Sequence, residues 1–215
     1  MRLTIILILI IIAVFIIEVF SFPLFGLTTE QFFDEYGFST NNLLTRPWVI
    51  ITSIFMHGDI THLLSNIIVL AFFGMALEEE IGWKRTLLIF MIGAFAGQLF
   101  SVFYYGPGEI SIGASAGIFG LIGVGILVAP FSFGFPNPMP LGLLGIIYAV
   151  YNIAGVFSGP SDISYIAHLG GLFAGLVFGF YYKGIKKGVG IVVLLTTVLL
   201  ALILTIPLII QLLAL

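Results

Sequence analysis

The stretch SIGASAGIFGLIG, residues 111–123, sets Ser115 among four glycines inside a chain that is otherwise mostly hydrocarbon. Glycines at three- and four-residue spacing let two helix backbones approach each other closely in a membrane. A hydroxyl on such a helix can therefore reach a side chain on the neighbouring one. The four glycines are Gly113, Gly117, Gly120 and Gly123.

A second segment has a similar pattern and carries a histidine. The stretch AHLGGLFAGLVFG, residues 167–179, contains His168 together with Gly171, Gly175 and Gly179 at four-residue spacing. A serine nucleophile and a histidine base need heavy atoms about 2.6–3.2 Å apart for proton transfer. Two glycine seams, each with one half of this pair, favour a serine hydrolase over ordinary helix packing.

The composition indicates a membrane protein. Of the 215 residues, 60% are hydrophobic and 8% are charged, and the mean hydropathy is +1.26. A soluble domain needs a polar exterior, whereas a membrane-spanning helix needs about 20 apolar residues. The absence of cysteine excludes disulfides and thiolate chemistry, and the net charge of -3 argues against nucleic acid as a partner.

Seven apolar segments are predicted as membrane spans, which gives an all-α polytopic helical bundle. The first span follows Arg2 without a small-residue cleavage site, so we expect a retained helix rather than a signal peptide. Residues 23–57, a polar and aromatic first loop, are interrupted too often to span. The predicted spans are residues 3–22, 60–77, 86–104, 114–130, 141–157, 164–182 and 189–213.

Lysine and arginine are distributed unevenly between the two sides of this topology. The N-terminus and the loops after spans two, four and six share one side, which holds every Lys and Arg except Arg46. The positive-inside rule then places the N-terminus in the cytoplasm and the C-terminus outside. We therefore expect a multi-pass protein of the cell membrane.

All three histidines of the chain fall in one layer near the outer face. Span two begins with His62 and Asn66, and His57 lies just ahead of it. Span four begins at Ser115, and span six carries His168 about one turn inward. Polar side chains in hydrocarbon are costly and are retained where they meet partners or water, so we expect one shared site toward the extracytoplasmic side.

The residues of span two suit a different role from that of a base. His62 and Asn66 are four residues apart and share one helix face. They can donate hydrogen bonds to an anionic oxygen, as an oxyanion hole requires, and the backbone N–H of Ser115 can supply a third donor.

No acidic residue in these three spans lies near the cluster. The nearest acid to His168 is Asp162, six residues earlier and off its helical face. We therefore expect a Ser–His dyad whose imidazole is oriented by packing rather than by a carboxylate. Of the other acids, Glu18 is expected at the outer interface and Glu78–Glu80 at a solvated helix end.

Together these residues resemble the rhomboid intramembrane serine proteases. The matching pieces are HGDITHLLSN (57–66), GASAG (113–117) and AHLGGLFAG (167–175), and RPWVIITSIFMH (46–57) resembles the end of the family's long first loop. Their order and spacing cover nearly the whole chain from span one to span six.

The resemblance implies a six-helix catalytic core, residues 1–182, followed by a linker and one additional C-terminal helix, residues 183–215. It implies Ser115 as nucleophile, His168 as general base, and His62, Asn66 and the Ser115 amide as oxyanion donors. Substrates would be transmembrane segments of proteins in the bilayer, reached through a water-filled cavity with span five as a gate, and neither a metal nor another cofactor is expected. The supporting site residues are Gly113, Gly117, Phe119, Gly171 and His57.

Two positions depart from the family pattern. Many members have Trp-Arg in the first loop, whereas Trp48 is followed here by Val49, so whatever that arginine anchors is held otherwise or not at all. Some members place a tyrosine against the catalytic imidazole, one turn after the serine. Phe119 occupies that position and can stack, but it has no hydroxyl.

Four rival interpretations use the same residues. GASAG fits the nucleophile elbow of α/β-hydrolases, but that motif needs a strand–turn–helix in an α/β sheet. Three histidines can bind zinc, but the chain has no H-E-x-x-H motif. A transporter also uses intramembrane polar residues, near the midplane between repeats that we do not find here. The last alternative is a catalytically inactive rhomboid-like protein that binds membrane proteins.

Overall fold

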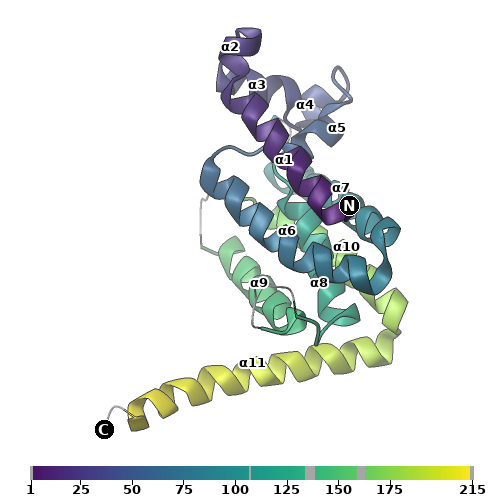
Figure 1. The fold of residues 1–215 in the computed structure, drawn as a ribbon, viewed down its shortest axis with the longest axis vertical. Helices are drawn as coiled ribbons and strands as arrows, with labels where there is room; N and C mark the ends of the chain where they lie inside the picture. Colours follow the sequence, from purple (N-terminus) through teal and green to yellow (C-terminus); the bar gives the residue numbers. More distant parts are fainter. Residues whose placement is uncertain (1, 107, 134–138, 159–162, 214–215) are drawn as a thin grey trace.

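The computed structural model describes residues 2–106, 108–133, 139–158 and 163–213 (Figure 1). Within these ranges, four helices are long and apolar enough to cross a membrane, and three shorter helices are also apolar. This finding confirms the prediction of an all-α polytopic membrane bundle. The long helices are α6 (Ile60–Ile81), α7 (Trp83–Tyr105), α10 (Tyr165–Lys183) and α11 (Ile185–Leu213), and the shorter ones are α1 (Leu3–Val19), α8 (Ser115–Val128) and α9 (Leu141–Val156).

The helix ends differ from the predicted spans where charged residues border them. The second span was expected to end at residue 77, but α6 continues to Ile81, and α11 begins at Ile185 rather than at residue 189. Hydropathy marks only the apolar part of a helix, whereas the backbone stays helical through flanking Glu and Lys residues. The first helix is shorter than predicted and ends at Val19.

The predicted first loop, residues 23–57, is built from short helical turns instead of a span. These turns are α2 (Ser21–Phe25), α3 (Thr29–Tyr36), α4 (Thr40–Leu43), α5 (Val49–Thr52) and the 3-10 turn η1 (Ser53–Phe55). A capping box starts α3, with the Thr28 hydroxyl and the Gln31 side chain each bonded to the other residue's backbone N–H.

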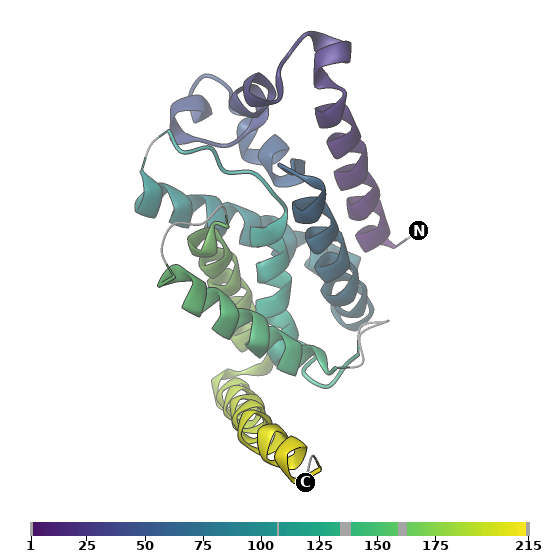
Figure 2. The same cartoon turned by 90° about the vertical axis from the view of Figure 1, so that its left-hand side faces the viewer.

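Helix α8 is the centre of the molecule, with α6, α7, α9 and α10 arranged around it (Figure 2). Every residue from Ala116 to Val128 is buried. A helix that is apolar on all sides and enclosed by others has no lipid-facing stripe. The small residues of the quoted stretch therefore set how closely each neighbour can approach.

The backbones of α8 and α10 touch along the two glycine seams. A methyl group added at Gly171 would overlap the carbonyl oxygen of Ala116, and one added at Gly175 would overlap the carbonyl oxygen of Gly120. On another face of α8, a methyl at Gly120 would lie 3.1 Å from the Cα of Gly93 in α7. Gly117 also faces α7, where its closest neighbour would be the backbone oxygen of Phe90 at 2.7 Å, so it does not belong to the α8–α10 seam.

Glu78 caps the first helix and is not a solvated residue at a helix end, as the sequence had suggested. Its carboxylate accepts hydrogen bonds from the backbone N–H groups of Leu3 (2.6 Å) and Thr4 (2.9 Å) and from the Thr4 hydroxyl (2.8 Å). A carboxylate at a helix N-terminus satisfies free N–H groups and complements the helix dipole. This contact fixes the start of α1 against the end of α6.

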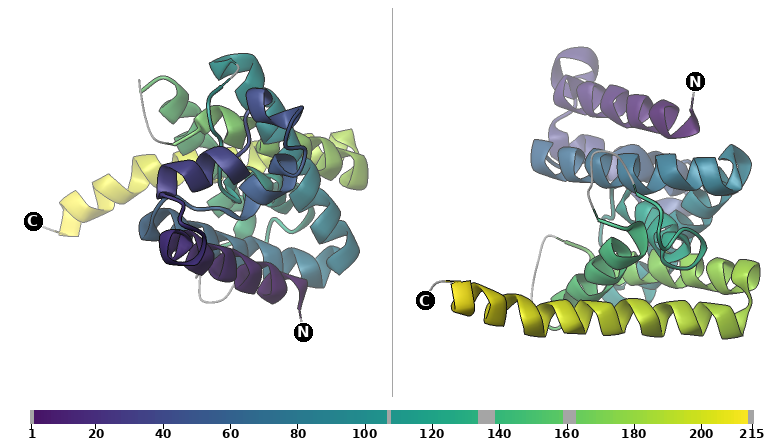
Figure 3. Two further views of the ribbon diagram at one scale, coloured as in Figure 1. Left: turned by 90° about the horizontal axis from the view of Figure 1, so that it is seen from above. Right: turned by 60° about the horizontal axis from the view of Figure 1, so that its bottom comes forward.

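Helix α11 lies at the edge of the helical bundle and projects beyond it (Figure 3). Its N-terminal part packs on α9, where Leu195 is buried and a methyl at Gly142 would lie 2.8 Å from it. Most of its other described side chains are exposed, as expected for a helix whose surroundings are lipid.

Two glycine substitutions, one in the seam between α8 and α10 and one outside it, should have different effects on stability. Gly175→Ala should destabilise the protein by about 1–3 kcal/mol because the new methyl forces the backbones apart. Gly190→Ala in α11 is the matched control, since nothing lies within 4 Å of its added methyl. Thermal unfolding in detergent should show a lower Tm for the first variant and an equal or higher Tm for the second. Equal Tm values for both variants would contradict the importance of this seam.

Candidate active site

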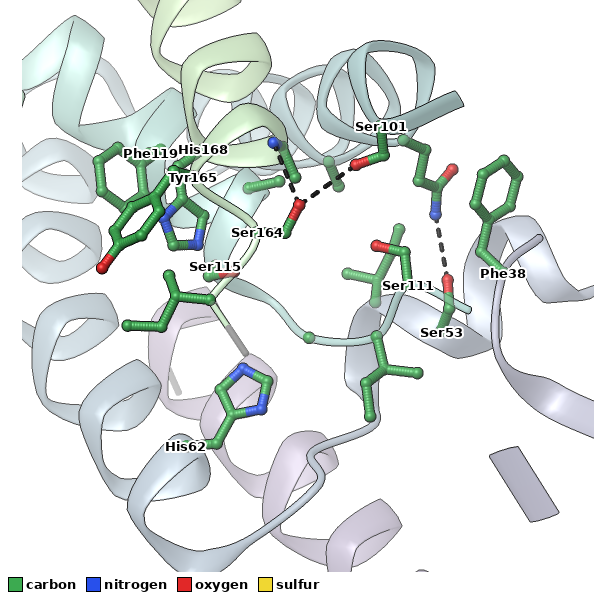
Figure 4. Close-up of a pocket in the computed structure, with 18 of the residues that line it drawn as sticks. Phe38, Ser53, His62, Ser101, Ser111, Ser115, Phe119, Ser164, Tyr165 and His168 are labelled. Atoms are coloured by element: carbon green, nitrogen blue, oxygen red, sulfur yellow. Dashed lines mark hydrogen bonds between the residues drawn. The ribbon is translucent and has the colours of Figure 1, made fainter. Parts of the chain in front are cut away.

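A cavity of about 700 Å³, lined by both apolar and polar side chains, lies between helices α6 to α10 and the first loop. Ser115, His168, His62 and Asn66 all line it, although they come from three different helices. Figure 4 shows the side chains of Ser115 and His168 next to each other, with His62 on the opposite side of Ser115. The sequence-predicted residues are therefore brought together, and the functional role of each stays a prediction.

Ser115 is the first residue of α8, and the chain before it is held by the first loop. Phe38 and Ser111 exchange two backbone hydrogen bonds (3.1 and 2.8 Å), and the N–H of Gly113 donates to the carbonyl of Ser53 (2.8 Å). Since the first N–H groups of a helix have no partner within it, the Ser115 hydroxyl lies beside free backbone donors at the positive end of the helix dipole.

His168 lies one turn into α10 and is stacked against α8. Its ring lies parallel to that of Phe119, with centroids 4.3 Å apart and an interplanar angle of 10°. Phe119 is one turn after Ser115 on α8. On α10, Gly171 is one turn after His168 and lies against the Ala116 carbonyl of α8. The close α8–α10 contact therefore sets both the depth and the plane of the imidazole relative to the serine.

A polar partner of the imidazole was missed by the sequence analysis. The Nδ1 atom of His168 lies 2.8 Å from the Oδ1 atom of Asn152, a residue of α9 that is fully buried. The expectation that packing alone orients this ring was therefore incomplete. An amide inside an apolar span is itself a signal, because such groups are retained where they find a partner.

His62 and Asn66 face the same cavity from α6. The Asp59 carboxylate caps this helix by accepting from the His62 N–H (2.8 Å). The Asn66 Nδ2 atom donates to the His62 carbonyl (2.8 Å), and because an amide nitrogen has two protons, one donor is left for the cavity. Gly113 is required here, since its φ of 117° is a conformation that favours glycine and an added methyl would lie 2.8 Å from the His62 Nε2 atom.

His57 supports His62 from behind and does not line the cavity. The two rings are tilted by 59° with centroids 4.8 Å apart, and His57 is 1% exposed. Burial and, to a smaller extent, the nearby His62 lower the pKa of His57 to about 4, so the ring is neutral at pH 7. The backbone N–H of His57 donates to the carboxylate of Glu18 (3.0 and 3.2 Å), which is buried at the end of α1 rather than exposed at the interface.

The first loop is anchored by an arginine at a different position from the one in the family pattern. The Arg46 guanidinium pairs with the carboxylates of Asp34 (3.2 Å) and Glu35 (3.1 Å) and also donates to the Asp34 carbonyl (2.9 Å). Arg46 therefore fixes the end of this loop to α3 although Val49 follows Trp48.

A buried amide joins the same loop to the bundle. The Gln98 side chain, on α7, donates to the Ile50 carbonyl (3.0 Å) and to the Ser53 hydroxyl (3.1 Å). Ser53 in turn accepts from Gly113 through its carbonyl. Gln98, which the sequence analysis did not single out, thus helps to position the segment that leads to Ser115.

Two further sequence predictions concern acids and metals. Asp162, the acid nearest to His168 in the sequence, lies outside the described residues. Across the ranges that the structure describes, no three His, Asp or Glu side chains are grouped as a metal site would require.

Comparison with known proteins shows the family to which the chain belongs. The sequence matches the Rhomboid domain family over residues 44–185. It is 31% identical to Rhomboid protein 1, mitochondrial, of Saccharomyces cerevisiae over 170 residues, which are 73% of this chain and 48% of that protein. It is 34% identical to RHOMBOID-like protein 1 of Arabidopsis thaliana, over 63% of this chain and 34% of that protein.

One of the similar proteins has the word protease in its name. The chain is 28% identical to Rhomboid-like protease 3 of Toxoplasma gondii, over 63% of this chain and 52% of that protein. The aligned regions thus span about a third to a half of these relatives. With a matching domain over most of its length and a helical bundle of membrane-spanning type, this chain is an integral membrane protein that belongs to the rhomboid family.

Proposed function

We propose that this chain is an intramembrane serine endopeptidase that cleaves transmembrane segments of other proteins with a Ser115–His168 pair. Membership in the rhomboid family supports an intramembrane protease-like function acting on transmembrane substrates in the bilayer. The observation that carries the finer proposal is one cavity that is lined by a serine, by an imidazole stacked on Phe119, and by donors from a third helix. Residues 1–182 would form the catalytic core, and residues 183–215 the linker and additional helix.

The first chemical step is attack on a peptide carbonyl. As Ser115 Oγ forms its bond to the carbonyl carbon, His168 takes the hydroxyl proton and the carbonyl oxygen becomes an oxyanion. Collapse of this intermediate breaks the C–N bond, and His168 gives its proton to the leaving amine. Water then attacks the ester formed between Ser115 and the substrate, and His168 takes a proton from this water. When the C–O bond of the ester breaks, His168 returns the proton to Ser115 Oγ and the second product is released.

The developing oxyanion needs hydrogen-bond donors that are already in place. The cavity offers the side chains of His62 and Asn66 and the backbone N–H of Ser115 at the start of α8. Each such donor is worth about 3 kcal/mol of transition-state stabilisation in serine hydrolases. The capped start of α6 and the positive φ of Gly113 hold these donors close to the serine.

Substitution of the two proposed catalytic residues tests the reaction directly. In purified protein, Ser115→Ala and His168→Ala should each lower cleavage of a reporter transmembrane substrate by about a thousandfold or more. Ser158→Ala is the matched control, because Ser158 is exposed at the end of α9 and does not line the cavity. Cleavage that persists in folded Ser115→Ala protein would overturn the proposal.

A serine-directed fluorophosphonate separates hydrolysis from mere binding. The parent protein should be labelled, Ser115→Ala should not, and a chelator should have no effect. A folded parent protein that is neither labelled nor able to cleave would favour an inactive binder of membrane proteins.

The backbone of the substrate should limit the rate of cleavage. A transmembrane helix keeps its carbonyls bonded internally, so it must unwind before one can reach Ser115. Substrates with Gly, Pro or other helix-breaking residues near their outer end should therefore be cut faster than a polyleucine helix of equal length. Equal rates for the two substrates in the same vesicles would contradict this requirement.

The orientation in the membrane can be tested with single cysteines, because the chain contains none. We propose a cytoplasmic N-terminus and an active site toward the extracytoplasmic side. A membrane-impermeant maleimide should then label Glu30→Cys in intact cells and label Lys187→Cys only after permeabilisation. Both substitutions are at exposed positions, and the opposite pattern would reverse the topology.

A further inference from the structure

The side chain of Asn152 joins two helices at the proposed base. It lies on α9, is fully buried, and makes two hydrogen bonds to α10. Its Nδ2 atom donates to the backbone carbonyl of Tyr165 (2.9 Å), and its Oδ1 atom lies 2.8 Å from the Nδ1 atom of His168.

The chemistry of these partners fixes the direction of both bonds. A backbone carbonyl can only accept, so the atom of Asn152 that faces Tyr165 must be the NH2 group. The atom that faces His168 is then the amide oxygen, which also can only accept. The proton between them must therefore be on His168 Nδ1.

This proton position determines what the imidazole can do. A neutral imidazole carries one N–H and one lone pair, so a proton on Nδ1 leaves the lone pair on Nε2. Stacking on Phe119 fixes the plane of the ring, but a flat contact with a phenyl ring does not distinguish one ring nitrogen from the other. Of these two contacts, only the bond to Asn152 makes that distinction.

We propose that Asn152 is the positioning residue of the active site, which holds His168 as the Nδ1–H tautomer so that Nε2 can accept the proton of Ser115. This inference rests on the proposed function and extends it with a third member, supplied by a helix that carries neither the nucleophile nor the base. The imidazole is then correctly protonated only while α9 lies against α10. Tyr148, one turn earlier on α9, packs edge-on against Phe119 and Phe73 and keeps α9 in this place.

Two substitutions separate the two hydrogen bonds of Asn152. Asn152→Leu has a similar size and removes both bonds. Asn152→Asp keeps an oxygen that can accept from His168 but replaces the NH2 group that donates to Tyr165. If Asn152 served only to tie α9 to α10 through Tyr165, the Asp variant would be impaired as much as the Leu variant.

The tautomer can be measured without any catalytic activity. The chain has three histidines, so 15N-histidine labelling gives three ring spin systems, and His168→Ala identifies the relevant one. At pH 8, well above the usual imidazole pKa of about 6.5, the parent protein and Asn152→Asp should show His168 protonated on Nδ1. Asn152→Leu should shift His168 toward the Nε2–H form, which is the more stable tautomer of a free histidine side chain.

The activity of the same variants should follow the tautomer. Asn152→Leu should lower kcat and the rate of fluorophosphonate labelling by about 100-fold or more with little change in KM, because the wrong tautomer disables the base. Asn152→Asp should recover most of this loss. Ile153→Leu, on the exposed side of α9, is the control for changes in the helix itself.

Either readout can overturn the inference. An Nε2–H tautomer in the parent protein would exclude it even if Asn152→Leu failed to fold. Folded Asn152→Leu protein with unchanged labelling, or an Asp variant as impaired as the Leu variant, would also exclude it. Loss of the proposed function is a separate result, since it would appear as cleavage by Ser115→Ala while the tautomer of His168 stayed as inferred.

Discussion

The direct backbone contact between α8 and α10 is the constraint on which the rest of the site depends. Lipid does not drive apolar helices together as water does, so their association relies on close packing. Here Gly171 and Gly175 of one helix lie against the carbonyls of Ala116 and Gly120 of the other. This contact leaves no room for even one methyl group, and it sets the distance between the start of α8 and the first turn of α10. The positions of the serine and the histidine therefore follow from the backbone contact of the two helices.

Polar groups then connect the outer parts of the molecule to this centre. Ser53 accepts from Gly113 and from Gln98, so the first loop, α7 and the segment before Ser115 meet at one residue. The Glu18 carboxylate connects α1 to this region, because it accepts a hydrogen bond from the backbone N–H of His57. Each bond satisfies a buried polar atom that would otherwise be costly in a low-dielectric environment. These bonds, most of them between a side chain and the backbone, connect the cavity to several elements at once.

Much of this arrangement could be predicted from the sequence, and the part that could not has a common cause. The alternation of spans across the membrane put His62, Ser115 and His168 at one depth, and the spacing of the glycines indicated which helices approach closely. The partners of Glu18, Glu78 and Asn152 were missed, because each lies on a different element, far along the chain or on the far side of a loop. Such contacts depend on the rotation of each helix about its axis. Helices that are apolar on nearly every side give little indication of that rotation, so the spacing of the glycines could not show that Gly117 faces α7.

An amide next to the imidazole fits a site inside a membrane better than a carboxylate would. An aspartate in the centre of a membrane helix costs about 3 kcal/mol on insertion scales, and burial without a counter-charge adds to the difficulty. An amide oxygen accepts the same Nδ1 proton without carrying a charge. It also stabilises a developing imidazolium less than a carboxylate does, so orientation is its main contribution. In the proposed reaction, more of the transition-state stabilisation would then have to come from the proposed oxyanion donors, which the capped start of α6 and the turn at Gly113 position.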